Sequence, residues 1–410
     1  MDSTEGVFLL FLSLLSEAWI LKTLGFAILV GSVMALIEKS GGVEGFIDYA
    51  VNKKAFVSSP RSALMLSYII GIAIFIESSI TALIAGAVGK PFCKKYKIPQ
   101  AKLAFVCDST SAPISSLIVL NGWGALLLGL ITTQVSLGMI EGDSVEILIN
   151  AVLYNFYAMS ALVVTFIYIM SAKDIGPMKS TQYLESTEVS GLKQESMYYM
   201  ILPIVSMISL VFVFLYITGD GDILKGSGSS SIFYTLVTTL IFMLFYYVKS
   251  GNMSLGTFAK TSFVGAKKLF PIAMILLLAF SIGRVTSELN TGLYLASLAN
   301  ENLNVHFLAA LIFLLSSVIA FSTGTSWGTF SIMIPVAIPM AVGMDANVSL
   351  AIGAVISGGV FGDHCSPISD TTVISSMAAD CEVMEHVQTQ LPYALISGFI
   401  AFMLFIIFSQ

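Results

Sequence analysis

The sequence predicts an all-α polytopic membrane protein. Mean hydropathy over the 410 residues is +0.91, and 56% of residues are hydrophobic while only 11% are charged. Apolar segments recur along the chain, and each is about long enough to cross ~30 Å of hydrocarbon as a helix. The N-terminus is acidic and no small-residue cleavage site follows the first apolar run, so we expect a multi-pass protein of the inner (plasma) membrane. Clear examples are residues 18–37, 201–217, 231–248 and 391–408.

Charged residues in the loops predict the topology, because short cytoplasmic loops retain lysine and arginine. Residues 90–102 and 249–268 are rich in lysine and are expected inside, whereas residues 141–146 and 219–222 are acidic and are expected outside. The polar stretch 173–196 is interpreted as a cytoplasmic linker. It divides the chain into a first repeat, residues 1–172, and a second repeat, residues 197–410.

The two halves share a motif. "FVCDSTSAPISS" at 105–116 is similar to "VFGDHCSPISD" at 360–370, and each follows an apolar segment with a polar centre. These segments, about 61–90 and about 306–342, are too short for two crossings of ~20 residues each, which predicts re-entrant hairpins. Counting crossings from the basic loops gives the halves opposite directions. Two inverted-topology repeats favour an alternating-access transporter over a channel.

Each motif contains a proline within an expected transmembrane helix. Proline removes a backbone hydrogen bond and clashes with the preceding turn, so we expect the helices at about 101–137 and 347–380 to unwind just before Pro113 and Pro367. Freed carbonyls at membrane depth are tolerated where they line a cavity. With nearby acids and hydroxyls they offer oxygen ligands suited to Na⁺. Alternatively, the serines and threonines bond only to their own helix. The candidate Na⁺ ligands are Asp108, Ser109, Asp363 and Ser366.

Four further polar features lie at or near these segments. Glu77, at the expected tip of the first hairpin, either holds a proton and a cation in turn or reaches an aqueous vestibule. His364 either relays protons or makes a structural hydrogen bond. Asp370 follows Asp363 by seven residues, which predicts two turns on one helix face. Residues 322–329, "STGTSWGT", form either a close backbone approach to an ion or a packing turn.

These strings together resemble the NhaC-type sodium/proton antiporter family. "GDHCSPISDTT", "GTSWGTF", "FIESSITALIAG" and "DSTSAPIS" carry the resemblance, which runs from about Gly41 to the C-terminus. It implies a scaffold part, a mobile transport part with two hairpins and two broken helices, and a homodimer. Many relatives have two aspartates where this chain has Glu77 and Ser78, which leaves the substrate open. The site implied by the resemblance comprises Glu77, Ser78, Asp108, Ser109, Thr110, Thr323, Thr325, Ser326, Asp363, Ser366 and Asp370.

The sequence therefore predicts a secondary active transporter that exchanges Na⁺ for H⁺. The alternative is a Na⁺- or H⁺-coupled transporter or exchanger of a small organic acid or amino acid. No arginine stands beside the expected breaks to clamp a carboxylate, which favours the inorganic ion modestly. We expect no enzyme, because Asp363, His364 and Ser366 are too close in sequence for triad geometry. We also expect no cofactor and no nucleic-acid partner, and membrane lipid, Na⁺ and H⁺ as partners.

Overall fold

The computed structural model describes residues 12–42, 45, 49, 57–75, 78–184, 195–221, 226–288 and 304–409. Throughout these residues the regular structure is helical, with no strand. Seven described helical stretches are long and apolar enough to cross a membrane, or up to eight when the neighbouring helices α6 (Gln100–Leu117) and α7 (Gly122–Ser136) count as one span. The all-α, multi-pass fold class is confirmed. The inverted orientation of the two repeats stays a prediction.

The chain forms two compact units, and each takes helices from both halves of the sequence. The first unit holds α2 (Ala18–Lys39), α7, α10 (Tyr198–Thr218), α11 (Gly228–Lys249) and α12 (Leu255–Glu288). The second unit holds all the other helices, and α8 (Ser144–Val152) crosses the boundary between the units. The second unit's helices are α4 (Pro60–Ala73), α5 (Ser78–Tyr96), α6, α9 (Phe156–Ser171), η1 (Gly176–Ser180), η3 (Val305–Phe307), α14 (Leu308–Thr323), α15 (Ser326–Gly343), α16 (Val348–Cys365), α17 (Asp370–Ala379) and α18 (Val383–Phe408).

Polar cross-links join the helices of the first unit. The Ser32 hydroxyl of α2 donates to the Ser262 carbonyl of α12 at 2.8 Å. The Lys22 ammonium donates to Ser230 of α11, also at 2.8 Å. Side-chain hydrogen bonds between helices hold a membrane bundle where apolar contact alone gives little preference over lipid.

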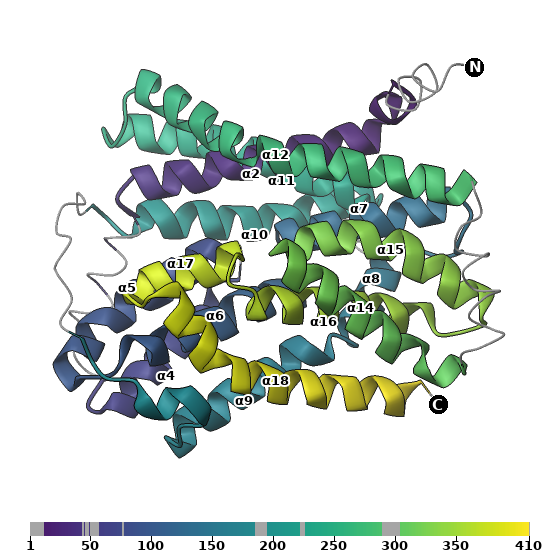
Figure 1. Ribbon diagram of the computed structural model, residues 1–410. Coiled ribbons are helices and arrows are strands. Elements are labelled where there is room, and N and C mark those ends of the chain that lie inside the picture. The colour runs from purple at the N-terminus through teal and green to yellow at the C-terminus, as the bar shows by residue number, and fades with distance from the viewer. Residues whose placement is uncertain are drawn as a thin grey trace. The chain divides into compact units, whose positions relative to one another are not determined.

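In the second unit, glycines let α14 and α16 lie in close contact (Figure 1). A Cβ atom at Gly358 would lie 2.3 Å from the Phe313 carbonyl oxygen, and one at Gly362 would lie 2.1 Å from the Ser317 carbonyl oxygen. The two glycines are four residues apart and therefore share one helix face. Small residues at this spacing allow two membrane helices to pack backbone to backbone. This contact fixes the end of α16, which carries Asp363 and His364.

Two helical pairs occupy the ranges expected for hairpins. In the first, α4 begins at Pro60 after a capping box between Ser59 and Ser62, and α5 follows. In the second, α14 ends at Thr323, Gly324 adopts a left-handed conformation (φ +65°), and Thr325 caps α15 by accepting from the Gly328 amide. The tight turn between α14 and α15 brings Ser326 close to α16.

The two broken helices differ from each other. Helix α16 ends at Cys365 and α17 begins at Asp370, so residues 366–369, including Pro367, interrupt it. By contrast, α6 continues through Pro113 and ends at Leu117, and α7 begins at Gly122. The expectation of unwinding just before Pro113 was therefore wrong, because the break follows the proline. A proline removes only one backbone donor from a helix. Two hydroxyls of α6 also bond to backbone carbonyl oxygens of the same helix: Ser111 donates to the carbonyl of Asp108 at 3.2 Å, and Ser116 donates to the carbonyl of Pro113 at 2.8 Å.

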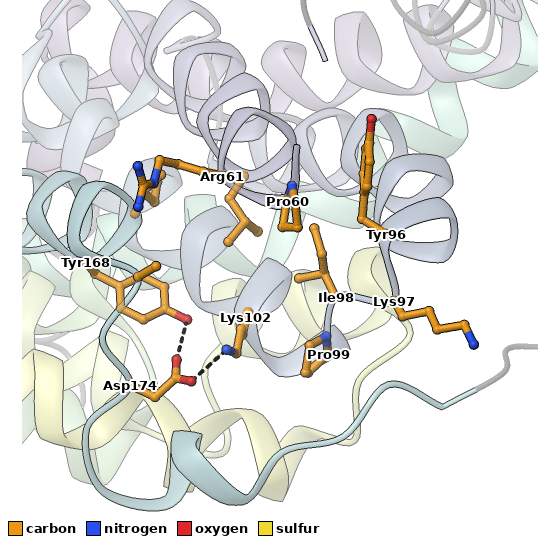
Figure 2. A pocket seen from close by; sticks show the side chains of 12 residues that line it. Pro60, Arg61, Tyr96, Lys97, Ile98, Pro99, Lys102, Tyr168 and Asp174 are labelled. Carbon is orange, nitrogen blue, oxygen red and sulfur yellow. Dashed lines mark hydrogen bonds and ion pairs between the residues drawn. The ribbon is translucent and has the colours of Figure 1, made fainter. Parts of the chain in front are cut away.

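The start of the expected linker packs against the second unit. The Asp174 carboxylate accepts from the Lys102 ammonium at 2.7 Å and from the Tyr168 hydroxyl at 3.2 Å (Figure 2). The Ile175 amide donates to the Tyr393 hydroxyl at 2.8 Å. Residues 174–180 are thus tied to α6, α9 and α18. Residues 185–194 of the same stretch lie outside the described part of the chain.

Candidate functional site

Asp108 is the centre of a buried polar cluster within the second unit. It lies in the middle of α6 with 0% of its surface exposed. Its Oδ2 atom lies 3.1 Å from His386 Nε2, 3.0 Å from Gln390 Nε2 and 3.3 Å from the Thr372 hydroxyl. Its Oδ1 atom has no hydrogen-bond partner in the described structure. One carboxylate oxygen is therefore held by three donors, and the other is a buried acceptor without a partner among the described residues.

His364, in the last turn of α16, joins Asp108 to α9. Its Nδ1 atom lies 2.6 Å from the Tyr157 hydroxyl, and its Nε2 atom lies 3.2 Å from Ser109 Oγ and 3.8 Å from Asp108 Oδ2. The Tyr157 hydroxyl has no second hydrogen-bond partner in the described residues. If it donates to Nδ1, both groups are satisfied, and the imidazole carries its proton on Nε2. That proton then points towards Ser109 and Asp108.

Helix α18 supplies a stripe of buried polar side chains. His386 and Gln390 are separated by one turn and both contact Asp108, and the Gln390 amide also donates to the His364 carbonyl at 2.6 Å. His386 Nδ1 and Gln390 Oε1 have no partner among the described residues. A bare Nδ1 fits the neutral imidazole with its proton on Nε2, because a second proton would leave a buried N–H unpaired.

Asp363 forms a second acidic position, one residue before His364. It is 2% exposed, and its Oδ2 atom accepts from the Ser326 hydroxyl of α15 at 2.9 Å. The single Ser326 hydroxyl proton is shared with the Gly359 carbonyl oxygen, which lies 3.1 Å from the hydroxyl. At the break, the Ser366 hydroxyl donates to the Phe321 carbonyl at 2.8 Å. Asp363 is therefore supported by the α14–α15 hairpin, whereas Asp108 is supported by α17 and α18.

The other hydroxyl residues that the sequence predicts for the site have different surroundings in the structure. The Thr110 hydroxyl donates to the Val106 carbonyl of its own helix at 2.8 Å, and exposed Thr323 does the same to Ile319 at 2.8 Å. Thr325 caps α15 rather than pointing at an acid. The alternative in which hydroxyls serve only their own helix therefore describes Thr110 and Thr323. Ser78 is buried at the start of α5.

Glu77 and Asp370 are the two remaining acids that the sequence predicts for the site. Glu77 lies outside the described residues, so its role stays a prediction. Asp370 does not share a helix face with Asp363, because residues 366–369 separate the two helices and Asp370 opens α17. The assumption of one continuous helix past Pro367 was wrong for this pair.

Sequence reasoning missed Tyr157, Thr372, His386 and Gln390. A signal for α18 existed: polar residues recur every three to four positions on an otherwise apolar helix of 26 residues. That spacing places them on one buried face. Tyr157 and Thr372 had no comparable signal, because a tyrosine or threonine in a membrane helix is common. The α18 stripe comprises His386, Thr389, Gln390, Tyr393 and Ser397, all at most 2% exposed.

The cluster suits a small hard cation and a proton. In the described part of the chain, no group of three or more His, Cys, Asp or Glu side chains is arranged to hold a metal ion. The cluster around Asp108 offers carboxylate, amide and hydroxyl oxygens, which are the hard ligands that small oxygen-seeking cations prefer. A charged carboxylate in this apolar surrounding is costly unless it is paired or used.

Comparison with known proteins agrees with this chemistry. The model of the Na⁺/H⁺ antiporter family matches residues 121–409. The chain belongs to the Na⁺/H⁺ antiporter family. It is 31% identical over 391 residues to an uncharacterized protein of Haemophilus influenzae, covering 90% of this chain and 75% of that one. The resemblance noted in the motifs is thus confirmed at the level of the family, and the chain is a multi-pass membrane protein of the secondary-transporter class.

One further protein is similar to a short part of this chain, and one solved structure is similar in fold. The malate-2H⁺/Na⁺-lactate antiporter of Bacillus subtilis is 38% identical over 88 residues, which are 22% of this chain and 19% of that protein. The YdaH transporter of Alcanivorax borkumensis shares the fold, with a TM-score of 0.69 and 15% identity over 99% of this chain and 89% of that chain. These proteins are transporters, which argues for a transporter rather than an enzyme. The family match includes Asp363, His364 and His386 but begins after Asp108.

Proposed function

We propose that the protein exchanges Na⁺ for H⁺ and that the two cations compete for the Asp108 carboxylate. The observation that carries this proposal is the asymmetry of that carboxylate. Its Oδ2 atom is held by His386, Gln390 and Thr372, while its Oδ1 atom is buried without a partner. With both histidines neutral, the cluster around Asp108 carries one negative charge, which either a proton or Na⁺ neutralises.

Asp363 contributes a second negative charge near the break in α16. The Ser326 hydroxyl holds its Oδ2 atom. His364, the next residue in the chain, lies 3.2 Å from Ser109 Oγ and 3.8 Å from Asp108 Oδ2 through its Nε2 atom. The role of His364 is to carry an N–H towards Ser109 and Asp108 while Tyr157 fixes the ring. Glu77, which the sequence predicts at the tip of the first hairpin, is proposed as a further carboxylate on the route of the proton, and the protein is proposed to work as a homodimer.

The test is Na⁺-driven proton movement in sealed proteoliposomes with a pH-sensitive dye inside. Wild-type protein should collapse a pH gradient when Na⁺ is added, and its apparent affinity for Na⁺ should fall as pH falls, because protonation removes the ligand. Glu77→Gln and Asp108→Asn are compared with Asp143→Asn, an exposed acid in a loop, which should behave as wild type. Na⁺ affinity that does not change with pH in the wild type would contradict competition.

If Glu77→Gln keeps the pH dependence of the wild type, the proton is not carried on Glu77. If the same variant loses that dependence while Na⁺ transport persists, Glu77 is the proton carrier and Asp108 is left as the Na⁺ ligand. The first result agrees with competition of the two cations at Asp108, and the second contradicts it.

The second candidate function is Na⁺- or H⁺-coupled exchange of a small carboxylate or amino acid. The relative from Bacillus subtilis, named as a malate-2H⁺/Na⁺-lactate antiporter, supports it. The same vesicles, loaded with one of a panel of dicarboxylates, hydroxy acids and amino acids, distinguish the two functions. Na⁺-dependent proton movement without any organic solute supports plain antiport, whereas movement that requires one solute supports exchange.

A further inference from the structure

A basic groove lies in the first unit, between the end of α2 and the first turns of α12. It forms an open cavity of about 560 Å³. Three lysines line it: Lys39 from α2, and Lys260 and Lys268 from α12. Thr257 and Thr261 add hydroxyl groups, and Glu38 is the single acid of the lining. The formal charges of three lysines and one glutamate give the groove lining a net charge of about +2.

The lysines of the groove have no counter-charge. Within the described structure no carboxylate lies within ion-pair distance of Lys39, Lys260 or Lys268. The smaller cavity of Figure 2, about 230 Å³, is different, because its central Lys102 is neutralised by Asp174. With three lysines and only one acid in the lining, the excess of positive charge is repulsive, and an anion in the groove would relieve that repulsion.

The groove continues into an apolar surface along the same helix. Val264 lines the groove and is 45% exposed, and the next exposed side chains on this side of α12 include Met274 and Leu278. Beside the groove α12 packs tightly against α2 at Gly265, where a Cβ atom would lie 2.1 Å from the Gly31 carbonyl oxygen. Residues 249–268 are also the stretch whose lysines predict the cytoplasmic side of the membrane. A phosphate in the groove would therefore have room for acyl chains beside it.

We propose that this groove binds the phosphate headgroup of an anionic phospholipid of the inner leaflet. The lysines neutralise the phosphate, Thr257 and Thr261 donate hydrogen bonds to it, and the apolar side of α12 receives the chains. Basic pockets between membrane helices on the cytoplasmic side suit such headgroups. The bound lipid bridges α2 and α12 at their cytoplasmic ends and so stabilises the first unit.

The test is lipid binding by the purified, delipidated full-length protein, measured by native mass spectrometry during titration with phosphatidylglycerol and with phosphatidylcholine. Lys260→Gln/Lys268→Gln removes two charges from the groove. Lys249→Gln/Lys267→Gln removes two exposed charges from the same stretch, outside the groove, and is the matched control. Because each lysine near a lipid phosphate contributes about a five-fold change in affinity, the groove variant should bind phosphatidylglycerol about 25-fold more weakly. The control should stay within about two-fold of wild type.

Equal weakening in both double variants would mean that overall charge governs binding, and it would overturn the proposal. Unchanged binding in the groove variant would overturn it as well. Thermal unfolding separates a lipid from a soluble anion. Phosphatidylglycerol should raise the melting temperature of the wild type but not of the groove variant. If inorganic phosphate alone gives the same stabilisation and phosphatidylglycerol adds nothing, the occupant is a soluble phosphate and the lipid assignment is wrong.

Discussion

Asp108 and Asp363 occur in similar sequence motifs but in different surroundings. Asp108 lies within a continuous helix, and its partners come from α17 and α18. Asp363 lies in the last turn of a helix that then breaks, and its hydroxyl partner comes from the α14–α15 hairpin. Similar short motifs therefore gave two different kinds of site, because partners distant in sequence decide what each carboxylate can do.

The two acids also differ in how firmly their surroundings hold them. Three donors from two helices fix one oxygen of Asp108 in a fully buried place. Ser326 and Asp363 instead join a hairpin tip to an interrupted helix, and interrupted backbone is where a membrane transporter can rearrange at low cost. We therefore propose that Asp108 is the fixed cation ligand and that Asp363 is the acid that responds to movement of the hairpin.

The largest effect on transport is expected when the charge of either Asp108 or Asp363 is removed. Asp108→Asn and Asp363→Asn should each reduce Na⁺-driven proton movement to the vesicle background, because the amide keeps the shape but loses the charge that attracts the cation. Both variants should still elute as folded protein on size-exclusion chromatography. Transport near the wild-type rate in either variant would show that its acid is structural, and the comparison between two acid sites would fail.

The next largest effect is expected when the hydrogen bond to Asp363 is removed. Ser326→Ala removes the hydroxyl that donates to Asp363. A hydrogen bond to a charged group contributes about 1.5–3 kcal/mol, so apparent Na⁺ affinity should weaken about ten-fold or more. Ser331→Ala is the control, because this buried hydroxyl on the same helix bonds only to the Trp327 carbonyl. Equal Na⁺ affinities in the two variants would mean that Ser326 does not act through Asp363.

Hydropathy predicted the all-α, multi-pass fold class, whereas the orientation inferred from the lysine distribution stays a prediction. The sequence predicted the candidate site only in part. Asp108, Asp363 and His364 were found because acids and histidines are rare in apolar segments. The break at Pro367 was also located, since a proline after a polar run interrupts a helix. Tyr157 and Thr372 could not be found, because they reach Asp108 and His364 only through contacts more than 200 residues apart in sequence. Hydrophobic patterning identifies buried faces but not which faces meet.

A smaller effect tests the turn of the second hairpin. Gly324 has a φ of +65°, and a Cβ atom there would lie 2.7 Å from Ile368 Cγ1 at the α16–α17 break. Gly138 has a similar φ of +68° but nothing within 4 Å of such an atom. Gly138→Ala should cost about 1–2 kcal/mol of backbone strain, and Gly324→Ala should cost about 1–3 kcal/mol more from overpacking. Thermal unfolding measures both. Equal costs would mean that the hairpin turn and the break are not in tight contact.

The smallest expected effect concerns the two prolines, and it tests the comparison at the level of the backbone. Pro113 lies inside a helix that already continues past it, so Pro113→Ala restores one donor without changing the path of the chain. Stability should be unchanged or slightly higher, and transport should stay close to wild type. Pro367 lies inside the break, and Pro367→Ala permits residues 366–369 to become helical, which would turn the Ser366 hydroxyl away from the Phe321 carbonyl. Transport should therefore fall in this variant alone. If Pro113→Ala lowers transport as much as Pro367→Ala, then α6 also opens during the cycle, and Asp108 belongs to a moving site like that of Asp363.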